Sequence, residues 1–342
     1  MTATAPTTTH IPTQMRAVVS HRYGGPEVLE EDVIARPEIA DDEVLVEVHA
    51  AGVDRGTWHL MSGKPYLIRA IGFGLTHPKQ PVPGFDLAGV VVEVGSAVTR
   101  FAVGDEVFGI GRAAFAEYAA APESKLSHKP AGVSFESAAV TAISGSTALQ
   151  ALTDVGGLEA GQSVLVIGAS GGVGSYAVQI ATALGARVTG VASAGKADAV
   201  LTLGAERVID YTTTDYLDGR EQYDLIVDIG GLNPVRRLQR ALNPTGTLVI
   251  VGGEGGGNWT GGFGRNLRAA LMSVFSRKTL KGFINRESHD STDRLAELMD
   301  AGTVVPQIGD RYPLDEARKA ITDLAAGRIT GKAVIVVRSS DR

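Results

Sequence analysis

The chain has 342 residues, of which 44% are hydrophobic and 20% are charged, and its formal net charge is −6. This length is comfortable for two domains, and the acidic balance argues against a general role in binding nucleic acid or anionic membranes. The absence of cysteine excludes disulfides, thiol nucleophiles and thiolate metal ligands. No apolar run approaches the roughly 20 residues that span a bilayer, and the N-terminus lacks the pattern of a signal peptide. We therefore expect a cytoplasmic protein.

The N-terminal part of the chain is predicted to be rich in β-strands. Residues 1–14 contain many Thr and Pro residues and are expected to form a flexible tail. Valine-rich runs such as 43–53 and 85–95 alternate partly between apolar and polar residues, and Gly, Pro and Asp separate such runs. This pattern favours a compact β-barrel or sandwich. Segment 58–83 is irregular, with Gly, Pro and His, and is expected to be a long loop.

Beyond Ser134 the pattern changes to an alternation of strands and helices. Apolar strands are predicted at 163–168, 187–192, 223–231 and 247–253, with helical segments between them. Unbroken apolar strands that alternate with helices indicate a parallel sheet whose two faces are both covered. We therefore expect a doubly wound α/β fold in this part of the chain.

A glycine-rich turn, GASGGVG at 168–174, joins the first of these strands to its helix. Glycine permits the unusual backbone angles of such a turn and lets the backbone approach a pyrophosphate, which the free N–H groups at the helix N-terminus can bind. The strand before the turn and the βαβ spacing after it are the context that a dinucleotide site requires. The alternative is a glycine-rich turn without a ligand. The candidate contacts are Ala169, Ser170, Gly171, Gly172, Val173 and Gly174, of which Ala169, Gly171 and Gly174 occupy the three fixed positions of G-x-G-x-x-G.

The second strand of this unit distinguishes between NAD and NADP. An NAD site usually ends that strand with an acidic residue, about 20 residues past the motif, that binds the ribose hydroxyl. Here Ser193 and Lys196 stand in that region and no acid does, so the site would attract a 2′-phosphate rather than repel it. Tyr211, at the end of a later strand, could add a phenol donor. We therefore predict NADP(H), while an ordinary solvated lysine remains the alternative for Lys196.

The other strand ends of a parallel sheet should line the same site. Two of them carry small residues that would let the nicotinamide half of the cofactor lie flat on the backbone. These candidates are Ile229, Gly230, Val251, Gly252 and Gly253. The alternative is that their glycines serve only as turn residues.

Several motifs in order resemble the medium-chain dehydrogenase/reductase superfamily, in its zinc-free quinone oxidoreductase-like branch. They include PVPGFDLAGVVVEVG (81–95), VGDEVFG (103–109), STALQAL (146–152), GASGGVG (168–174) and LGAERVIDY (203–211). The resemblance implies a GroES-like catalytic domain, residues 15–133 plus 285–342, with a Rossmann domain, residues 134–284, inserted into it. It also implies an active site between the domains, a cofactor contact at Thr147 within STALQAL, and a homodimer or tetramer.

Metal binding is not expected from this resemblance. Zinc-dependent relatives carry Cys where Asp54 stands, and Gly-His-Glu where residues 84–86 read Gly-Phe-Asp. Asp54, His59 and Asp86 form a poor zinc ligand set. Without zinc, hydrogen-bond donors must polarise the substrate. The candidate catalytic residues are Asp54, Thr57, His59 and Tyr66, in a segment that departs from the Asn-x-x-Asp pattern common among zinc-free relatives, and a purely structural role is the alternative for each.

These features predict a zinc-independent, NADPH-dependent oxidoreductase that transfers a hydride to a quinone, an enone or a similarly activated small acceptor. The product anion of such an acceptor can take its proton from water, so the protein must mainly orient the reactants and exclude solvent. Two alternatives remain open: a dehydrogenase of simple carbonyls and alcohols, and an NADPH-binding sensor without turnover. We expect a small-molecule substrate, and neither nucleic acid nor a membrane as partner.

Overall fold

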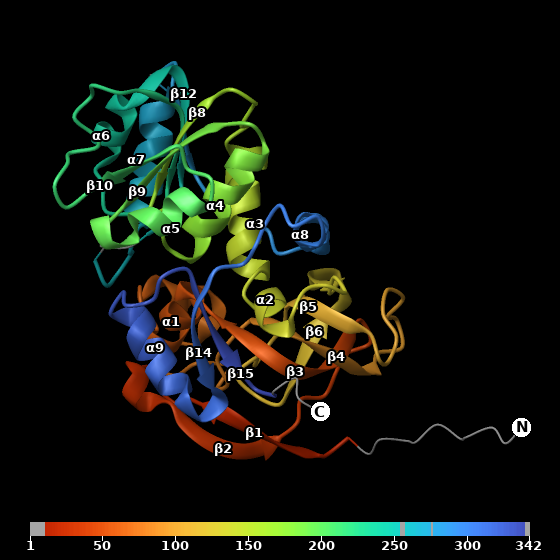
Figure 1. Cartoon of the computed structure of the whole chain (residues 1–342). Helices are drawn as coiled ribbons and strands as arrows, with labels where there is room; N and C mark the ends of the chain where they lie inside the picture. Colours follow the sequence, from red (N-terminus) through yellow and green to blue (C-terminus); the bar gives the residue numbers. More distant parts are fainter. Residues whose placement is uncertain (1–10, 254–256, 275, 339–342) are drawn as a thin grey trace, which may run out of the picture.

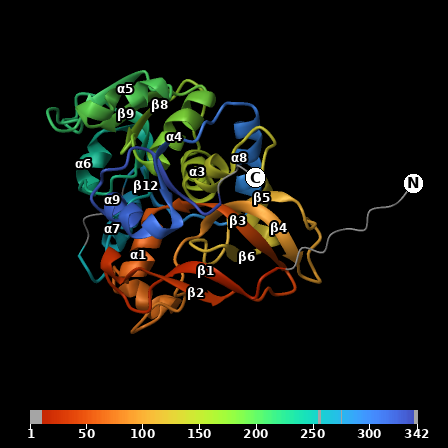
Figure 2. The same cartoon turned by 60° about the horizontal axis from the view of Figure 1, so that its bottom comes forward.

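The computed structural model describes residues 11–253, 257–274 and 276–338. Figure 1 shows two lobes, one built around each of two large sheets, with α3 (Ala142–Gln150) between them. Figure 2 shows the same position for α3 from a second direction. None of the helices in the described ranges is long and apolar enough to cross a membrane.

The first lobe contains a seven-stranded sheet with strand order β14-β15-β3-β4-β5-β7, and with β6 paired to β3. Its neighbouring strands are antiparallel, except that β14 and β15 run parallel. A two-stranded ribbon, β1-β2, lies beside this sheet. The strands of this lobe are β1 (Gln14–Val19), β2 (Glu30–Ala35), β3 (Glu43–Val53), β4 (Asp86–Val94), β5 (Glu106–Ile110), β6 (Tyr118–Pro122), β7 (Leu126–His128), β14 (Ile308–Pro313) and β15 (Lys332–Val336).

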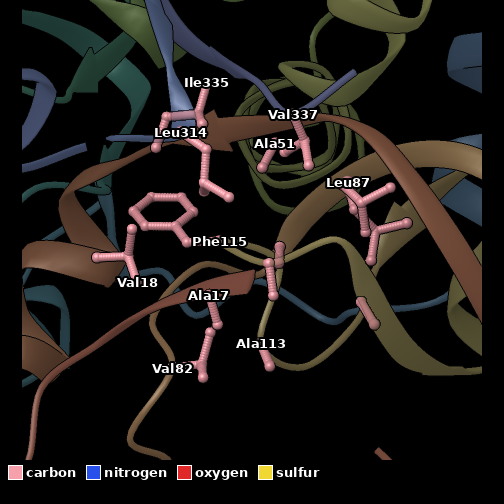
Figure 3. Packing of buried hydrophobic residues seen from close by; sticks show 14 of the residues in the cluster. Ala17, Val18, Ala51, Val82, Leu87, Ala113, Phe115, Leu314, Ile335 and Val337 are labelled. Carbon is pink, nitrogen blue, oxygen red and sulfur yellow. The ribbon is translucent and has the colours of Figure 1, made fainter. Parts of the chain in front are cut away.

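The core of this lobe contains residues from both the N-terminal and the C-terminal parts of the chain. Figure 3 shows Phe115 packed among Val18, Leu314 and Ile335, so residues from the first strand and from the last strand share one buried cluster. The central strand β3 alternates little in burial, because it is covered on both faces by apolar side chains. The C-terminal segment is therefore an integral part of the N-terminal sheet.

The second lobe is the predicted doubly wound sheet. Its six strands are all parallel, in the order β10-β9-β8-β11-β12-β13. The strand order reverses between β8 and β11, which is the position where doubly wound folds bind their ligands. The strands are β8 (Ser163–Ile167), β9 (Arg187–Ala192), β10 (Arg207–Asp210), β11 (Tyr223–Asp228), β12 (Leu242–Ile250) and β13 (Thr279–Gly282).

Both faces of this sheet are covered. Val164 and Val166 of β8 join a cluster with α4, whereas Leu165 and Ile167 join a second cluster with α6 and α7. This separation follows from the two-residue period of a strand. The remaining helices are α1 (Arg55–Ser62), α2 (Phe135–Ala139), α4 (Gly172–Ala183), α5 (Ala197–Thr202), α6 (Val235–Arg240), α7 (Phe263–Val274), α8 (His289–Asp300) and α9 (Ala317–Ala325).

Two expectations from the sequence need correction. The tail expected over residues 1–14 is too long, because Gln14 already belongs to β1, Ile11 packs against the core, and Thr13 accepts a hydrogen bond from Arg36; residues 1–10 lie outside the described ranges. The loop expected over 58–83 contains most of α1 and a single π-helical turn at Arg69–Phe73. The cause is local capping, since the Asp54 side chain caps the start of α1 and Gly63 ends it in the left-handed conformation.

Candidate functional site

The turns that follow the parallel strands meet at the carboxyl edge of the six-stranded sheet. Each turn donates backbone hydrogen bonds to the last carbonyl groups of a neighbouring strand, so the turns after β8, β11 and β12 are held side by side. These bonds join Ala169 N to Val191 O (3.1 Å), Gly230 N to Ile167 O (3.2 Å) and Gly252 N to Asp228 O (3.0 Å). The predicted nucleotide-binding turns are therefore brought to one edge.

The glycine-rich turn leaves open space at the N-terminus of α4. Gly168 has φ +90°, and a Cβ atom on Gly174 would lie 2.1 Å from the Gly168 carbonyl oxygen, so the helix can pack on the turn only without a side chain at 174. A Cβ atom on Gly171, by contrast, would meet only that same oxygen, at 3.4 Å. No side chain caps α4 at Gly171. The start of α4 therefore has no side-chain cap, and the turn before it lies beside Gly331, which pairs with Gly171.

The residues predicted to bind a 2′-phosphate gather at the ends of β9 and β10. Ser193 follows β9, Tyr211 follows β10 and is exposed, and the Tyr211 N–H donates to the Ala192 carbonyl at 3.3 Å. Lys196 is half-buried and donates to the Ile329 carbonyl at 3.1 Å.

Sequence reasoning missed an acidic group in the same region. Asp210 ends β10, and its carboxylate accepts the Thr212 backbone N–H at 3.0 Å and lies beside the backbone of Ala194. The hydrogen bonds from Thr212 lower the pKa of Asp210 below its ordinary value, so the group is ionised at neutral pH. A 2′-phosphate would therefore meet both a lysine and an aspartate.

Arg265 of α7 holds the two turns that would contact the nicotinamide half. Its guanidinium donates to the carbonyl groups of Gly231 (2.6 Å) and Gly252 (3.2 Å) and forms an ion pair with the buried Asp228. A Cβ atom on Gly252 would lie 1.8 Å from the Ile229 carbonyl oxygen, so the two turns can approach this closely only because residue 252 has no side chain. The candidates of this group lie partly exposed at the sheet edge: Ile229, Gly230, Val251, Gly252 and, more fully exposed, Gly253. Thr147 is instead buried within α3, which packs against α4.

The other candidate side chains lie on α1 and just after it. Asp54 is buried and accepts the Thr57 N–H at 2.8 Å, which makes it the N-cap of α1. Within the described ranges, Asp54 Oδ2 and Thr57 Oγ1 are buried without a hydrogen-bond partner. His59 Nδ1 lies 3.0 Å from the Lys64 carbonyl oxygen. Asp54 and Thr57 therefore present buried oxygen atoms that could bind a further group.

Tyr66 connects the two lobes. Its backbone N–H donates to the Asn258 carbonyl at 2.7 Å, and the N–H of Leu67 donates to the Trp259 carbonyl at 3.1 Å. The Tyr66 ring meets the Trp259 ring edge to face, with 5.5 Å between the ring centroids. The Arg69 guanidinium carbon lies over the Tyr66 ring, 4.7 Å from its centroid. This geometry matches the anchoring alternative for Tyr66.

A buried ion pair lies between the lobes and was not predicted. Asp86 accepts the Ile143 N–H at 2.8 Å through Oδ1, and Lys332 Nζ lies 3.5 Å from Asp86 Oδ2 and 3.1 Å from Ser144 Oγ. Burial raises the pKa of Asp86 above its ordinary value, Lys332 lowers it, and Asp54 raises it further. The one signal in the sequence is the position of these charges at the starts of otherwise apolar strands.

Other possible sites are few. In the part of the chain that the structure covers, no group of three or more His, Cys, Asp or Glu side chains is placed to hold a metal ion. A cavity of about 490 Å³ lies at the opposite, amino-terminal edge of the six-stranded sheet, lined by residues such as Arg187, Arg207 and Glu221. Arg207 and Glu221 are paired with each other, and doubly wound folds bind ligands at the carboxyl edge, so we do not assign a function to this cavity.

The sequence matches known proteins over nearly its whole length. A family described as alcohol dehydrogenase GroES-like domain matches residues 40–131, and one described as zinc-binding dehydrogenase matches residues 203–335. The 2-methylene-furan-3-one reductase of Solanum lycopersicum is 31% identical over 345 residues, which cover 96% of this chain and 81% of that protein. The quinone oxidoreductase of Homo sapiens is 32% identical over 339 residues, which cover 94% of this chain and 98% of that protein.

A solved structure shows the same fold. The quinone oxidoreductase of Escherichia coli complexed with NADPH has a TM-score of 0.81 and 26% sequence identity, over 94% of this chain and 100% of that chain. The predicted combination of a GroES-like β-rich domain and a Rossmann-type parallel sheet is confirmed. The chain therefore belongs to the medium-chain dehydrogenase/reductase superfamily, in its quinone oxidoreductase-like branch.

Proposed function

We propose that this protein is a zinc-independent, NADPH-dependent oxidoreductase that reduces a quinone, an enone or a similarly activated small acceptor. The observation that carries the proposal is the open space in front of Gly171 and the uncapped N-terminus of α4, at the edge where the strand-end turns meet. The relatives support the acceptor class, since one is a quinone oxidoreductase and another a reductase of a 2-methylene-furan-3-one. The NADPH in the Escherichia coli structure supports the cofactor.

Each part of the dinucleotide would have its own group of residues. The backbone of 169–174 would bind the diphosphate, and Ser193, Lys196 and Tyr211 would bind the 2′-phosphate. The turns 229–230 and 251–253, held by Arg265, would support the nicotinamide half. Thr147, the remaining predicted cofactor contact, lies buried in α3. When bound, the cofactor supplies the hydride, and the protein supplies orientation and a low-water environment.

The acceptor would lie near the start of α1. The Thr57 hydroxyl, which has no hydrogen-bond partner in the described ranges, would donate to the substrate oxygen, and Asp54, as the N-cap of α1, would shape the floor of the site. His59 and Tyr66 would act less directly, since His59 contacts the Lys64 carbonyl and Tyr66 is packed against Trp259. An activated acceptor suits this site, because its reduced anion needs little help from a strong acid.

The exposed edge of β13 is where we propose that two copies pair as a homodimer. In the described ranges β13 pairs with β12 alone, and an open edge strand tends to pair with another strand. Beside it, α7 exposes Leu267, Leu271 and Val274 by 65%, 61% and 76%. These residues follow the helical spacing i, i+4, i+7, so they form one apolar stripe. A two-fold axis would bury both stripes and extend the sheet across the dimer.

The proposed activity is tested by following NADPH oxidation with a panel of acceptors. We expect turnover with quinones and enones and little with unactivated ketones, because hydrogen-bond donors polarise a simple carbonyl less than a Lewis acid does. A chelator such as 1,10-phenanthroline should leave the rate unchanged. Preference for simple ketones, or loss of activity with the chelator, would favour the dehydrogenase alternative, and tight NADPH binding without turnover would favour the sensor.

Substitution of two glycines separates cofactor binding from folding. Gly171→Val should abolish measurable NADPH binding in a fluorescence titration and leave the urea-unfolding midpoint nearly unchanged, since its side chain enters open space. Gly174→Ala should instead destabilise the fold by about 1–3 kcal/mol, because its Cβ atom meets the Gly168 carbonyl oxygen. Retained affinity in the Gly171 variant would contradict the placement of the diphosphate.

Substitution of Lys196 tests the 2′-phosphate assignment. Lys196→Ala should raise the Kd for NADPH by about tenfold or more, the effect of losing a charged hydrogen bond, and leave the Kd for NADH unchanged. Asp210→Asn removes the neighbouring negative charge and should lower the Kd for NADPH relative to that for NADH. NADH serves as the internal control. Equal effects of Lys196→Ala on the two dinucleotides would show that the lysine does not contact the 2′-phosphate.

Substitution on α7 tests the dimer. Leu271→Asp should convert the protein from a dimer to a monomer in size-exclusion chromatography with light scattering, since it places charges at the centre of the apolar stripe. Leu201→Asp is the matched control, because Leu201 is also exposed, by 43%, but lies on α5 at the opposite side of the sheet. A wild-type protein that is monomeric at micromolar concentration would refute the proposal.

A further inference from the structure

We propose that Lys332, which packs against the glycine-rich turn, is a positioning residue for the dinucleotide: its ammonium group balances two buried carboxyl groups, Asp54 and Asp86, whose negative charge would otherwise repel the diphosphate. The inference rests on the proposed function, because it concerns the affinity for that cofactor. It assigns a role to Asp86 and Lys332, two charged groups that the proposed hydride transfer does not use.

The strand register places the three groups on one face of the sheet. Ala333 of β15 pairs with Val53 of β3, so Lys332 lies level with Asp54. Ala51 of β3 pairs with Leu87 of β4, so Asp86 lies level with Gly52. Positions 52 and 54 point to the same side of β3, because side chains alternate along a strand. In agreement, a Cβ atom on Gly52 would lie 2.8 Å from Asp86 Cβ.

The cluster contains two carboxyl groups and one ammonium group and is almost fully buried. Asp54, Asp86 and Lys332 are exposed by 7%, 0% and 2%. Lys332 Nζ lies 3.1 Å from Ser144 Oγ and 3.5 Å from Asp86 Oδ2, whereas Asp54 Oδ2 and Asp86 Oδ2 have no hydrogen-bond partner in the described part of the chain. Charges in such a place are weakly screened, so the ammonium is needed to offset the carboxylates.

The lysine also touches the turn that would bind the diphosphate. The N–H of Gly331 donates to the Ser170 carbonyl at 2.9 Å, which ties the start of β15 to the turn. Lys332 Cδ lies 2.9 Å from the position that a Cβ atom would take on Gly172, so its stem packs against the first residue of α4. Removal of its charge would therefore leave the two carboxyl groups without a compensating cation.

The test measures dinucleotide affinity and does not depend on turnover. Lys332→Met should raise the Kd for NADPH and for NADH by the same factor, about tenfold or more. Asp86→Asn combined with Lys332→Met should restore most of the affinity, because it removes the charge that the lysine offsets. Lys332→Arg should stay close to wild type. Adenosine 2′-monophosphate, which lacks the diphosphate, should bind the Lys332→Met protein as it binds wild type.

Lys129→Met is the matched control, because Lys129 is also buried and pairs with Glu106 at 2.9 Å, but its side chain packs on Phe135 and not on the turn. It should leave both Kd values unchanged. An unaltered Kd in Lys332→Met, or no recovery in the double variant, overturns the inference. If Lys332→Met does not fold, the Asp86→Asn, Lys332→Met protein provides the test. A Kd for NADPH well above the wild-type value in that folded double variant counts against the inference. A wild-type protein that binds neither dinucleotide would instead refute the proposed function.

Discussion

Direct contact between backbone turns at the carboxyl edge of the six-stranded sheet is the constraint on which the rest of the structure depends. At Gly174 and at Gly252 a side chain would have to occupy the space of a carbonyl oxygen, 2.1 Å and 1.8 Å from the positions of their Cβ atoms. The turns can approach each other only because residues 174 and 252 have no side chains. The N-terminus of α4 has no side-chain cap, and the proposed binding of an anion rests on this feature.

The features that the sequence predicted are those encoded by neighbouring residues. The parallel sheet was predicted because apolar strands and helices alternate, and the glycine-rich turn because strand, glycines and helix are consecutive. Helix α1 was missed because it has only eight residues and begins at Asp54, which was considered for its chemistry rather than as a cap. A capping role becomes visible only when the Asp54 carboxylate is seen to accept the Thr57 N–H.

The charged pairs could not be predicted because their partners are distant in sequence. Arg265 lies 37 residues from Asp228, and Lys332 lies 188 residues from Ser144, so no local spacing connects them. The sequence shows only that Asp86, Asp228 and Lys332 are charged residues at the ends of apolar strands. Burial of a charged group at such a position costs free energy, and in each case a tertiary contact with an oppositely charged or polar group offsets this cost.

Strand β15 connects the glycine-rich turn to the seven-stranded sheet of the first lobe. It pairs with β3, which ends one residue before Asp54, and it begins directly after Gly331, whose N–H donates to the Ser170 carbonyl in the turn. A shift of β15 by one residue would move Lys332 to the opposite face and break the contact with Gly172, so this register cannot slip. The pairing of these two strands therefore fixes the glycine-rich turn relative to the start of α1. The proposed hydride transfer requires reacting atoms within about 3–3.5 Å, and this link between the two lobes would hold the proposed cofactor and acceptor sites together.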